Sequence, residues 1–485
     1  MIPDLPGLDA LARIVLPAVG WAFGLGMVSL ALWMVARRPL PKVPVVARLG
    51  GLAWNRNQFC RGWLITGDTG SGKTSSGINR LAHEVFRNVP DWGGLCIDEK
   101  GVYWETLAEM ARHYGRTASL IHLRVRTDGE DSAWRPPHRF NLVGDRSIPF
   151  STYAKFVVDT ATSLGQGGDK GFFKTQSQTH IAHALELLHE LGRPVTLVGA
   201  YELLTDATLL AKALEDLGEL LQTPAREALT RHFVSRLLEQ PSEQLGGVRE
   251  TIANHLQHFL APTIAEVFSP REGSTFGFEA LDRGGILLVT MPQKYQTERR
   301  YVNTFLKLLF YNHALRRFDK PKAERAKDNL LILWADEAQR FMTASEDGTS
   351  DYNCVDVIRE AGATVVAAAQ STTSFVPPLG IDKSRVLTLN LRNRLIFRAA
   401  DEADAVQSAD FLGKKRVIKR SWGFSGGKRN VNYTETEEHR LKPHLLRTLR
   451  DHECVVVHCD RGHRRRHLPP LDPQGNVPAW YSSHS

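Results

Sequence analysis

A glycine-rich loop between a short apolar run and a helical pattern constrains the fold of this chain more than any other feature. The segment WLITGDTGSGKTS contains Gly67-x4-Gly72-Lys73-Thr74 directly after the apolar run 63–66. This spacing is that of a phosphate-binding loop, which requires a strand before it and a helix after it. The residues expected to surround nucleotide phosphates are Gly67, Asp68, Thr69, Gly70, Ser71, Gly72, Lys73, Thr74 and Ser75.

Each residue type in this loop has a physical role. Glycines let successive backbone N–H groups turn toward one anion, and the N-terminus of the following helix adds its positive dipole. Lys73 is predicted to reach the β- and γ-phosphates, and Thr74 to offer its hydroxyl to Mg²⁺. We therefore expect the chain to bind ATP together with Mg²⁺.

A second apolar run ends in two neighbouring acidic residues. In LLILWADEAQRF the run delivers Asp336 and Glu337 at its carboxyl end, the edge at which open α/β sheets bind ligands. Asp336 is predicted to belong to the Mg²⁺ shell, and Glu337 to polarise the water that attacks the γ-phosphate. The alternative is a solvated acidic pair at a strand end. Two adjacent acids favour a protein that hydrolyses the nucleotide over one that only binds it.

Two further polar residues flank the buried-looking run in ATVVAAAQSTTSF. Gln370 ends this run, where its amide is expected to contact the γ-phosphate or the attacking water, although glutamine is also common in turns. Arg359 precedes the run in VIREAGATVV. It either reaches across a subunit boundary to a neighbour's γ-phosphate or only pairs with a helix dipole.

Short apolar runs alternate with amphipathic stretches along most of the chain, which predicts an α/β fold. Several runs are apolar throughout, as in a parallel sheet that is covered on both faces. The predicted strands are 63–66, 95–97, 119–122, 286–291, 330–335, 364–369, 393–397 and 454–459. Between 151 and 270 apolar residues recur at helical spacing instead, which predicts an all-α domain inserted into the α/β domain.

The start of the chain carries a long uncharged segment. Residues 14–36 contain no charged side chain, and a helix of this length crosses a hydrocarbon core of roughly 30 Å. A signal peptide is the weaker alternative, because the run is too long and acidic residues precede it. The basic residues after it are Arg37, Arg38, Lys42 and Arg48. The positive-inside rule then places the N-terminus outside and the bulk of the chain in the cytoplasm.

These patterns divide the chain into six parts. They are a membrane anchor (1–36), a linker (37–58), the first part of a nucleotide-binding domain (59–150), the inserted all-α domain (151–270), the second part of the nucleotide-binding domain (271–470) and a tail (471–485).

The composition permits an acidic partner without requiring one. Hydrophobic residues make up 42% and charged residues 24%, which excludes a wholly disordered or collagenous chain. The net charge is +8, which is compatible with binding to nucleic acid or anionic lipid. The five cysteines are odd in number and scattered, so no disulfide framework is predicted. The cysteines and histidines of 454–467 lack paired CxxC spacing, so a zinc site is not predicted.

A basic run near the C-terminal end is a candidate for DNA contacts. Its residues are Lys414, Lys415, Arg416, Lys419 and Arg420. They either meet DNA phosphates without reading sequence or form a solvated basic face beside a β-hairpin. No aromatic stacking platform clearly accompanies the run. The following residues, SWGFSGGKRN (421–430), predict an exposed loop because of their glycine, serine and lysine.

The order of these motifs resembles the type IV coupling proteins, the TraG/TraD-like ATPases of conjugation and type IV secretion, which are relatives of the FtsK and HerA motors. The resemblance rests on GDTGSGKT, LCIDEKGVYWETLAE, HRFNLV, LWADEAQRF and REAGATVVAAAQST. It implies a RecA-like nucleotide-binding domain that carries an all-α domain and assembles into a homo-hexamer. It also implies that this assembly delivers or translocates DNA.

The resemblance also assigns roles at matching positions. It implies nucleotide binding by Lys73 and Thr74, and metal and water roles for Asp336 and Glu337. Gln370 matches the family's sensor and Arg359 its trans-acting arginine. Asp98, Lys100 and Gly101 match a DxKG turn, for which a structural or nucleotide-adjacent role is expected.

The partners that the resemblance implies are single-stranded DNA bound without sequence preference, relaxase or relaxosome proteins, and a type IV secretion channel. The implied location is the bacterial inner membrane. Many relatives have two membrane helices where this sequence shows one, which leaves its docking to a channel open. Two other functions stay open: an FtsK/HerA-like translocase of duplex DNA in defence or segregation, and an ATP-regulated receptor for protein substrates.

Overall fold

The computed structural model describes residues 44–131, 133–165, 171–345, 348–425 and 428–471. The predicted membrane helix of 14–36 lies outside these residues. Within the described ranges, no helix combines the length and the apolar character that a membrane crossing needs.

A nine-stranded sheet lies at the centre of the described chain, in the order β13-β12-β9-β3-β8-β7-β4-β6-β5. Neighbouring strands are parallel from β9 to β5, and β12 and β13 add antiparallel pairs at one edge. The strands of this sheet are β3 Trp63–Thr66, β4 Gly93–Asp98, β5 Leu120–Arg124, β6 Ile286–Thr290, β7 Leu331–Asp336, β8 Ala363–Ala369, β9 Asn393–Ile396, β12 Glu453–His458 and β13 Gly462–His467. Each of the eight predicted strands overlaps one of them, so the expected α/β fold is confirmed.

Two antiparallel pairs lie outside this sheet: β1 Val45–Leu49 with β2 Leu52–Asn55, and β10 Lys414–Ser425 with β11 Lys428–His439. The second pair corrects the prediction of a loop at 421–430. Residues 421–425 and 428–430 of that segment are strand residues.

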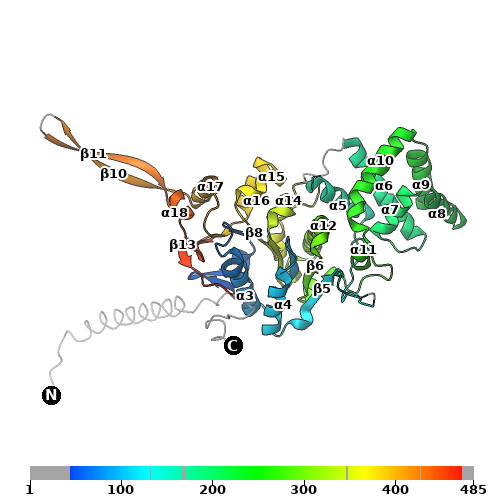
Figure 1. Ribbon diagram of the computed structural model, residues 1–485, viewed down its shortest axis with the longest axis horizontal. Helices are drawn as coiled ribbons and strands as arrows, with labels where there is room; N and C mark the ends of the chain where they lie inside the picture. Colours follow the sequence, from blue (N-terminus) through cyan, green and yellow to red (C-terminus); the bar gives the residue numbers. More distant parts are fainter. Residues whose placement is uncertain (1–43, 132, 166–170, 346–347, 426–427, 472–485) are drawn as a thin grey trace, which may run out of the picture. The chain divides into compact units, whose positions relative to one another are not determined.

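Helices cover the sheet and fill the stretch between β5 and β6 (Figure 1). Those before and after that stretch are α2 Arg56–Phe59, α3 Asn79–Asn88, α4 Tyr103–His113, α12 Gln296–Arg316, α13 Lys322–Arg325, α14 Asp351–Cys354, α15 Val376–Leu379, α16 Ile381–Asn390, α17 Glu402–Leu412 and α18 Pro443–Arg447. Those between β5 and β6 are α5 Phe150–Ser163, α6 Gly171–Glu190, α7 Leu197–Thr205, α8 Ala207–Glu219, α9 Pro224–Phe233, α10 Ser242–Leu256 and α11 Pro262–Phe268.

Alternate residues of the central strands enter two different hydrophobic cores. Leu331 and Leu333 of β7 join the core that contains α12 and the helices α5 to α11. Ile332 and Trp334 of the same strand join the core that contains α3 and α4. Because side chains alternate across a strand, a sheet that is covered on both faces requires apolar residues at every position. This explains why the strands are visible in the sequence as unbroken apolar runs.

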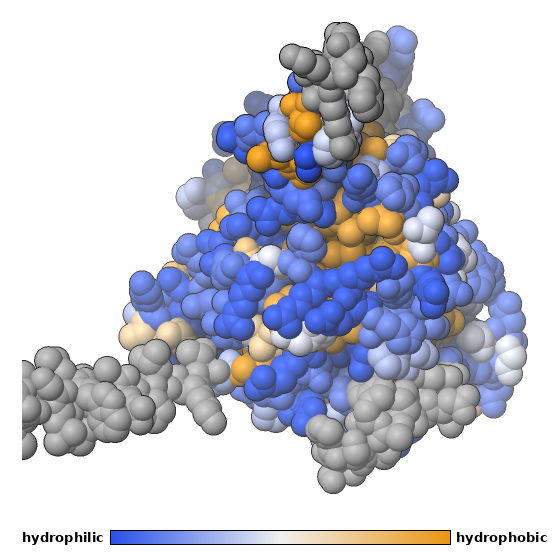
Figure 2. Space-filling view, turned by 90° about the vertical axis from the view of Figure 1, so that its left-hand side faces the viewer, coloured by the Kyte–Doolittle hydropathy of each residue, from blue (hydrophilic) through white to orange (hydrophobic). Residues whose placement is uncertain are grey.

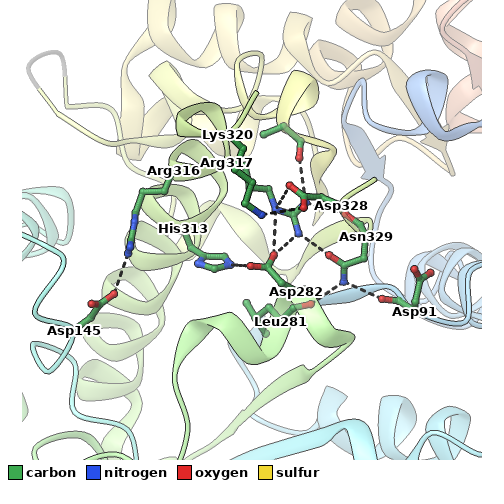
Figure 3. Close-up of polar contacts among 11 residues, drawn as sticks. Asp91, Asp145, Leu281, Asp282, His313, Arg316, Arg317, Lys320, Asp328 and Asn329 are labelled. Carbon is green, nitrogen blue, oxygen red and sulfur yellow. Dashed lines mark hydrogen bonds and ion pairs between the residues drawn. The ribbon is translucent and has the colours of Figure 1, made fainter. Parts of the chain in front are cut away.

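The end of α12 ties together the segments that lead into several strands (Figure 3). The buried guanidinium of Arg317 donates to the carbonyl oxygen of Asn329 at 2.8 Å and forms an ion pair with Asp282. The amide of Asn329 donates to the carbonyl oxygens of Asp91 at 2.9 Å and Leu281 at 2.8 Å. Burial alone would raise the pKa of Asp282, but hydrogen bonds from His313 and Arg317 outweigh it and hold that pKa well below its usual value. This network links the segments that precede β4, β6 and β7, at the amino-terminal edge of the sheet. The candidate site lies at the opposite edge.

Candidate nucleotide site

Four adjacent strands end at one cavity. In the sheet order β3-β8-β7-β4, the glycine-rich loop follows β3, Gln370 follows β8, Asp336 ends β7 and Asp98 ends β4. All four strands are parallel, so these ends lie at the same edge of the sheet. A cavity of about 960 Å³ opens there and is lined by the loop, Asp336, Glu337 and Gln370. The carboxyl edge of a parallel sheet is where such folds bind ligands.

The loop has the backbone that its glycines permit. Gly70 and Gly72 have φ angles of 83° and 100°, a region that strains residues with a Cβ atom. A Cβ at Gly72 would also lie only 2.7 Å from Nδ1 of His452. The helical turn Lys73–Ile78 follows and continues into α3. The loop therefore ends at a helix N-terminus, as the binding of an anion requires.

Lys73 is a buried cation that lines the cavity, with 8% of its surface exposed. Its Nζ donates to the carbonyl oxygens of Gly67 at 2.7 Å and Asp68 at 3.3 Å. Burial lowers the pKa of Lys73, and the charges of Glu337 and Asp336 oppose this shift. The ammonium thus faces the acidic end of β7, with the glycine-rich loop around it.

The two acids at the end of β7 differ in environment. The backbone N–H of Glu337, whose φ is 50°, donates to Oδ1 of Asp336 at 3.1 Å. Oε2 of Glu337 accepts a hydrogen bond of 2.7 Å from the amide of Gln339. Asp336 lies opposite Asp98 in the register of β7 with β4. Burial raises the pKa of Asp336 to about 6, and the nearby charges of Glu337 and Asp98 add to the shift.

The raised pKa of Asp336 predicts how its removal changes stability. The folded state holds a proton on Asp336 more tightly than the unfolded chain, whose Asp pKa is about 3.9, so the protein loses stability as the pH rises from about 4 to about 6. Asp336→Asn avoids this loss. We expect its thermal unfolding midpoint to exceed that of the wild type above pH 6, by a margin that shrinks toward pH 4.

The control for this measurement is Asp319→Asn, which removes the same charge from an exposed position. Differential scanning fluorimetry of the three proteins from pH 4 to pH 8 provides the comparison. A difference between Asp336→Asn and wild type that stays constant over this range would contradict the assigned shift.

The structure separates the two polar residues that flank β8. Gln370 lines the cavity, and its carbonyl oxygen accepts the N–H of Gly67 at 3.2 Å. Arg359 precedes β8, whose seven residues span about 20 Å at roughly 3.3 Å per residue. The side chain of Arg359 is 42% exposed and lies 3.8 Å from Glu360. Arg359 is therefore not part of the cavity of its own chain.

The DxKG turn supports the site from β4. The carboxylate of Asp98 accepts the N–H groups of Val102 at 3.0 Å and Tyr103 at 3.2 Å, at the start of α4. Burial raises the pKa of Asp98, and these hydrogen bonds oppose the shift. Lys100 lines the cavity. Asp98 thus holds the start of α4, and Lys100 lies beside the cavity.

Residues near the C-terminal end complete the cavity, and sequence reasoning did not identify them. The N–H of His452 donates to the carbonyl oxygen of Ser71 at 2.9 Å, and its Nδ1 lies 2.8 Å from Oγ of Ser76. The N–H of Leu471 donates to the carbonyl oxygen of Ser75 at 2.8 Å. No local pattern marks these residues, because their contacts are with a loop more than 370 positions earlier in the chain.

The residues around the cavity fit a nucleotide and Mg²⁺. Backbone N–H groups at a helix N-terminus and the buried Lys73 suit phosphates, while the Thr74 hydroxyl and the Asp336 carboxylate are oxygen ligands of the kind that Mg²⁺ prefers. All of them border the same cavity. A Cβ atom at Gly67 or Gly72 would clash with Ser71 or His452, so the close packing around the loop requires glycine at both positions.

Two other candidate clusters lie away from this cavity. The basic run forms one strand of the β10–β11 hairpin, where Arg416 and Lys419 pair with acids of β11. In the C-terminal cysteine and histidine cluster, Nε2 of His458 bonds to the carbonyl oxygen of Ala53 at 3.1 Å, which requires Nε2 to carry the proton. Nδ1 then accepts the N–H of Asp460 at 2.9 Å. Both ring nitrogens of His458 are therefore hydrogen-bonded.

Comparisons with known proteins give one family and one fold. The family model of the type IV secretion-system coupling protein DNA-binding domain matches residues 149–461. A search of curated protein sequences finds no match.

Among solved structures, the bacterial conjugative coupling protein TrwBdeltaN70 in its unbound monoclinic form has a TM-score of 0.63 and 16% identity, over 89% of this chain and 90% of the other. TrwB in complex with ADP and Mg²⁺ has a TM-score of 0.64 and 16% identity, over 90% and 92%. TrwB in complex with the ATP analogue ADPNP has a TM-score of 0.62 and 18% identity, over 90% and 91%. These similarities show a shared fold.

Proposed function

The chain belongs to the type IV secretion-system coupling proteins, and on this premise we propose that it is an ATPase that delivers or translocates DNA, or protein attached to DNA, to a type IV secretion channel. One observation carries this proposal. The glycine-rich loop, the acids Asp336 and Glu337, and Gln370 come from three adjacent strands and line one cavity. The complexes of TrwB with ADP and Mg²⁺ and with ADPNP support ATP and Mg²⁺ as the ligands.

In the proposed mechanism the protein binds the phosphates before it acts on water. Lys73 exchanges its hydrogen bonds to the carbonyl oxygens of Gly67 and Asp68 for bonds to the β- and γ-phosphates. Thr74 and Asp336 would hold Mg²⁺, which would neutralise phosphate charge when bound. Asp336 must lose its proton for this role, and the nearby ammonium of Lys73 favours that loss.

Glu337 and Gln370 act on the attacking water in this proposal. The carboxylate of Glu337 accepts a hydrogen bond from the water and orients it toward the γ-phosphate. The amide of Gln339 holds Oε2 of Glu337 in place. Gln370, at the end of the neighbouring strand, contacts the γ-phosphate or the water and senses the loss of the phosphate.

Arg359 is proposed to act on the nucleotide of a neighbouring subunit in a homo-hexamer. Its position before β8, at the edge opposite the cavity, supports a role in trans over one in its own site. Its exposed side chain is available to a partner chain. An arginine in this role stabilises the charge that develops on the transferred phosphoryl group.

The remaining assignments concern placement and cargo. Residues 1–36 are proposed to anchor the chain in the bacterial inner membrane with the N-terminus outside, because residues 14–36 are uncharged and basic residues follow. Residues 151–270 are proposed as a domain inserted between the two parts of the nucleotide-binding domain. Single-stranded DNA, relaxase or relaxosome proteins and a type IV secretion channel are the proposed partners.

Binding of ATP and Mg²⁺ by the full chain tests this proposal. Lys73→Ala removes the buried cation of the cavity and is expected to weaken ATP binding about 10-fold or more, because hydrogen bonds to charged groups contribute about 1.5–3 kcal/mol. Isothermal titration calorimetry measures the affinity. Lys327→Ala removes an exposed positive charge and should bind as the wild type does. Equal affinities of Lys73→Ala and wild type, or no binding at millimolar ATP, would overturn the proposal.

A further inference from the structure

The β10–β11 hairpin differs from every other strand pair in the described residues by its length. Each strand has twelve residues, and the two pair only with each other. Figure 1 shows the hairpin extending away from the sheet. A lone two-stranded hairpin is only marginally stable in water. A partner that covers part of the hairpin would stabilise it, so its exposed side chains are candidates for contacts with such a partner.

The register of the hairpin sorts its residues onto two faces. Arg420 lies opposite Tyr433, and Trp422 lies opposite Val431. Because side chains alternate along a strand, these four share one face with Ile418. We call Ile418, Arg420, Trp422, Val431 and Tyr433 the aromatic face.

The other face of the same segment is polar. There Lys419 lies opposite Thr434 and Ser421 lies opposite Asn432. The hairpin thus has two different faces, and none of its residues belongs to the hydrophobic cores that the described part of the chain forms.

The aromatic face is exposed and contains a cation between two rings. Cζ of Arg420 lies 3.9 Å from the ring centroid of Trp422 and 5.9 Å from that of Tyr433. The exposed fractions are 69% for Ile418, 47% for Trp422 and 66% for Tyr433. Figure 2, which views the molecule from the side of the hairpin, shows hydrophobic residues near the top among hydrophilic ones. Exposed apolar clusters of this kind mark interaction sites.

Charge along the hairpin changes from base to tip. The acids of β11 lie toward the base, where Arg416 pairs with Glu435 at 3.4 Å and Lys419 with Glu438 at 2.7 Å. From Lys419 to Thr434 the sequence contains lysine and arginine but no aspartate or glutamate. The distal part is therefore positive, which favours a polyanionic partner.

We propose that the aromatic face binds single-stranded nucleic acid without sequence preference. This inference rests on the proposed delivery of DNA and names the surface that contacts it. Every base has a π-face that can stack on Trp422 and Tyr433, and the guanidinium of Arg420 adds a cation for base faces or phosphates. In a duplex the bases already stack on one another, so their faces are not available.

The proposal changes the set of residues expected to contact DNA. Lys414 and Lys415 lie at the base of the hairpin, and Arg416 and Lys419 already pair with acids. Arg420 is the member of the run that lies between the two aromatic rings. In this proposal the rings of Trp422 and Tyr433 provide much of the affinity for single-stranded nucleic acid, in addition to the positive charge.

Fluorescence anisotropy of a labelled 20-nucleotide oligodeoxythymidine, measured with the full chain in detergent and without nucleotide, tests the proposal. Trp422→Ala and Tyr433→Ala are each expected to weaken binding roughly 10-fold, as for other stacked bases. Trp422→Phe keeps a ring and should retain most of the affinity. Ser421→Ala and Asn432→Ala change the polar face and should bind as the wild type does. Trp422→Ala and Tyr433→Ala should each lose less affinity for a 20-base-pair duplex than for the oligodeoxythymidine.

Photocrosslinking gives a second measurement that does not depend on the folding of a variant. An oligonucleotide with 5-iododeoxyuridine, irradiated with the wild-type chain, should attach to peptides that contain Trp422 or Tyr433. Crosslinks that map only elsewhere would overturn the proposal, as would alanine variants with unchanged affinity or with equal losses for duplex and single strand.

Two other partners of this face are outcomes of the same test. If the variants lose binding to vesicles of phosphatidylglycerol and phosphatidylcholine but keep their affinity for the oligonucleotide, the face contacts membrane and the proposal is wrong. If the variants keep their affinity for the oligonucleotide and for the vesicles and only their sedimentation coefficient changes, the face contacts a second copy of the chain. The proposal is then equally wrong. The oligonucleotide is bound in the absence of ATP. A loss of oligonucleotide binding can therefore be told apart from a loss of ATP binding at Lys73.

Discussion

Glu337→Gln should lower the rate of ATP hydrolysis by about 100-fold or more while ATP and Mg²⁺ still bind. General-base groups contribute roughly 10²–10⁴-fold to a rate, and an amide of the same size cannot accept the proton of the attacking water. The position of Glu337 at the end of β7, beside the buried Lys73, is the basis for this expectation. Release of inorganic phosphate by the full chain measures the rate.

The matched control is Glu324→Gln, which makes the same chemical change at an exposed residue of α13, away from the cavity. Its rate should equal that of the wild type. A Glu337→Gln protein that hydrolyses ATP at the wild-type rate would refute the proposed role of Glu337. Hydrolysis that neither single-stranded nor duplex DNA changes would favour the ATP-regulated protein receptor over either DNA motor.

Asp351→Ala should lower the free energy of unfolding by roughly 3–5 kcal/mol, the cost of leaving a buried charge without its partner. Lys307 and Asp351 form an ion pair in which both side chains are fully buried. The carboxylate also accepts hydrogen bonds from the hydroxyl of Tyr311 at 2.5 Å and the N–H of Thr343 at 2.7 Å. Alanine removes all of these contacts and leaves the ammonium of Lys307 inside the protein.

Urea unfolding followed by tryptophan fluorescence measures this change. Asp356→Ala, at an exposed position two residues after α14, should stay within about 0.5 kcal/mol of the wild type. The double variant Lys307→Met with Asp351→Asn removes both charges and should recover part of the loss. An Asp351→Ala protein as stable as the wild type would show that the ammonium finds water or another partner.

The Lys307–Asp351 pair also connects stability to the site. Nζ of Lys307 donates to the carbonyl oxygen of Phe341, which lies four residues after Glu337. Asp351 in turn holds Thr343. The segment that follows the acids of β7 is therefore fastened to α12 from within the core.

The glycine-rich loop and the strand ends could be predicted because both follow from neighbouring residues. A phosphate-binding loop is contiguous, so its spacing appears in a single window of the sequence. Asp336 ends β7 and Gln370 follows β8, and both strands are almost entirely apolar because the sheet is buried on both faces. Their placement at one edge follows from the parallel direction of β7 and β8.

The hairpin could not be predicted in the same way. Glycine and serine at 421–430 favour a loop, yet 421–425 and 428–430 are strand residues. Strand formation depends on cross-strand neighbours more than on intrinsic preference. Arg420 and Trp422 lie on the same side only because this segment is a strand, and Arg420 meets Tyr433 only because of the register between β10 and β11.

The sequence by itself determined the α/β class, the phosphate-binding loop and the acids at a strand end, because periodicity and local backbone chemistry act within a few residues. The tertiary structure alone decided that β3, β8, β7 and β4 are neighbours, that His452 packs against Gly72, and that Arg359 lies away from its own cavity. The pairing of β3 with β8, that of β4 with β7 and the packing of His452 against Gly72 join segments hundreds of residues apart. They depend on how the whole chain buries its apolar surface, and no single segment encodes that arrangement.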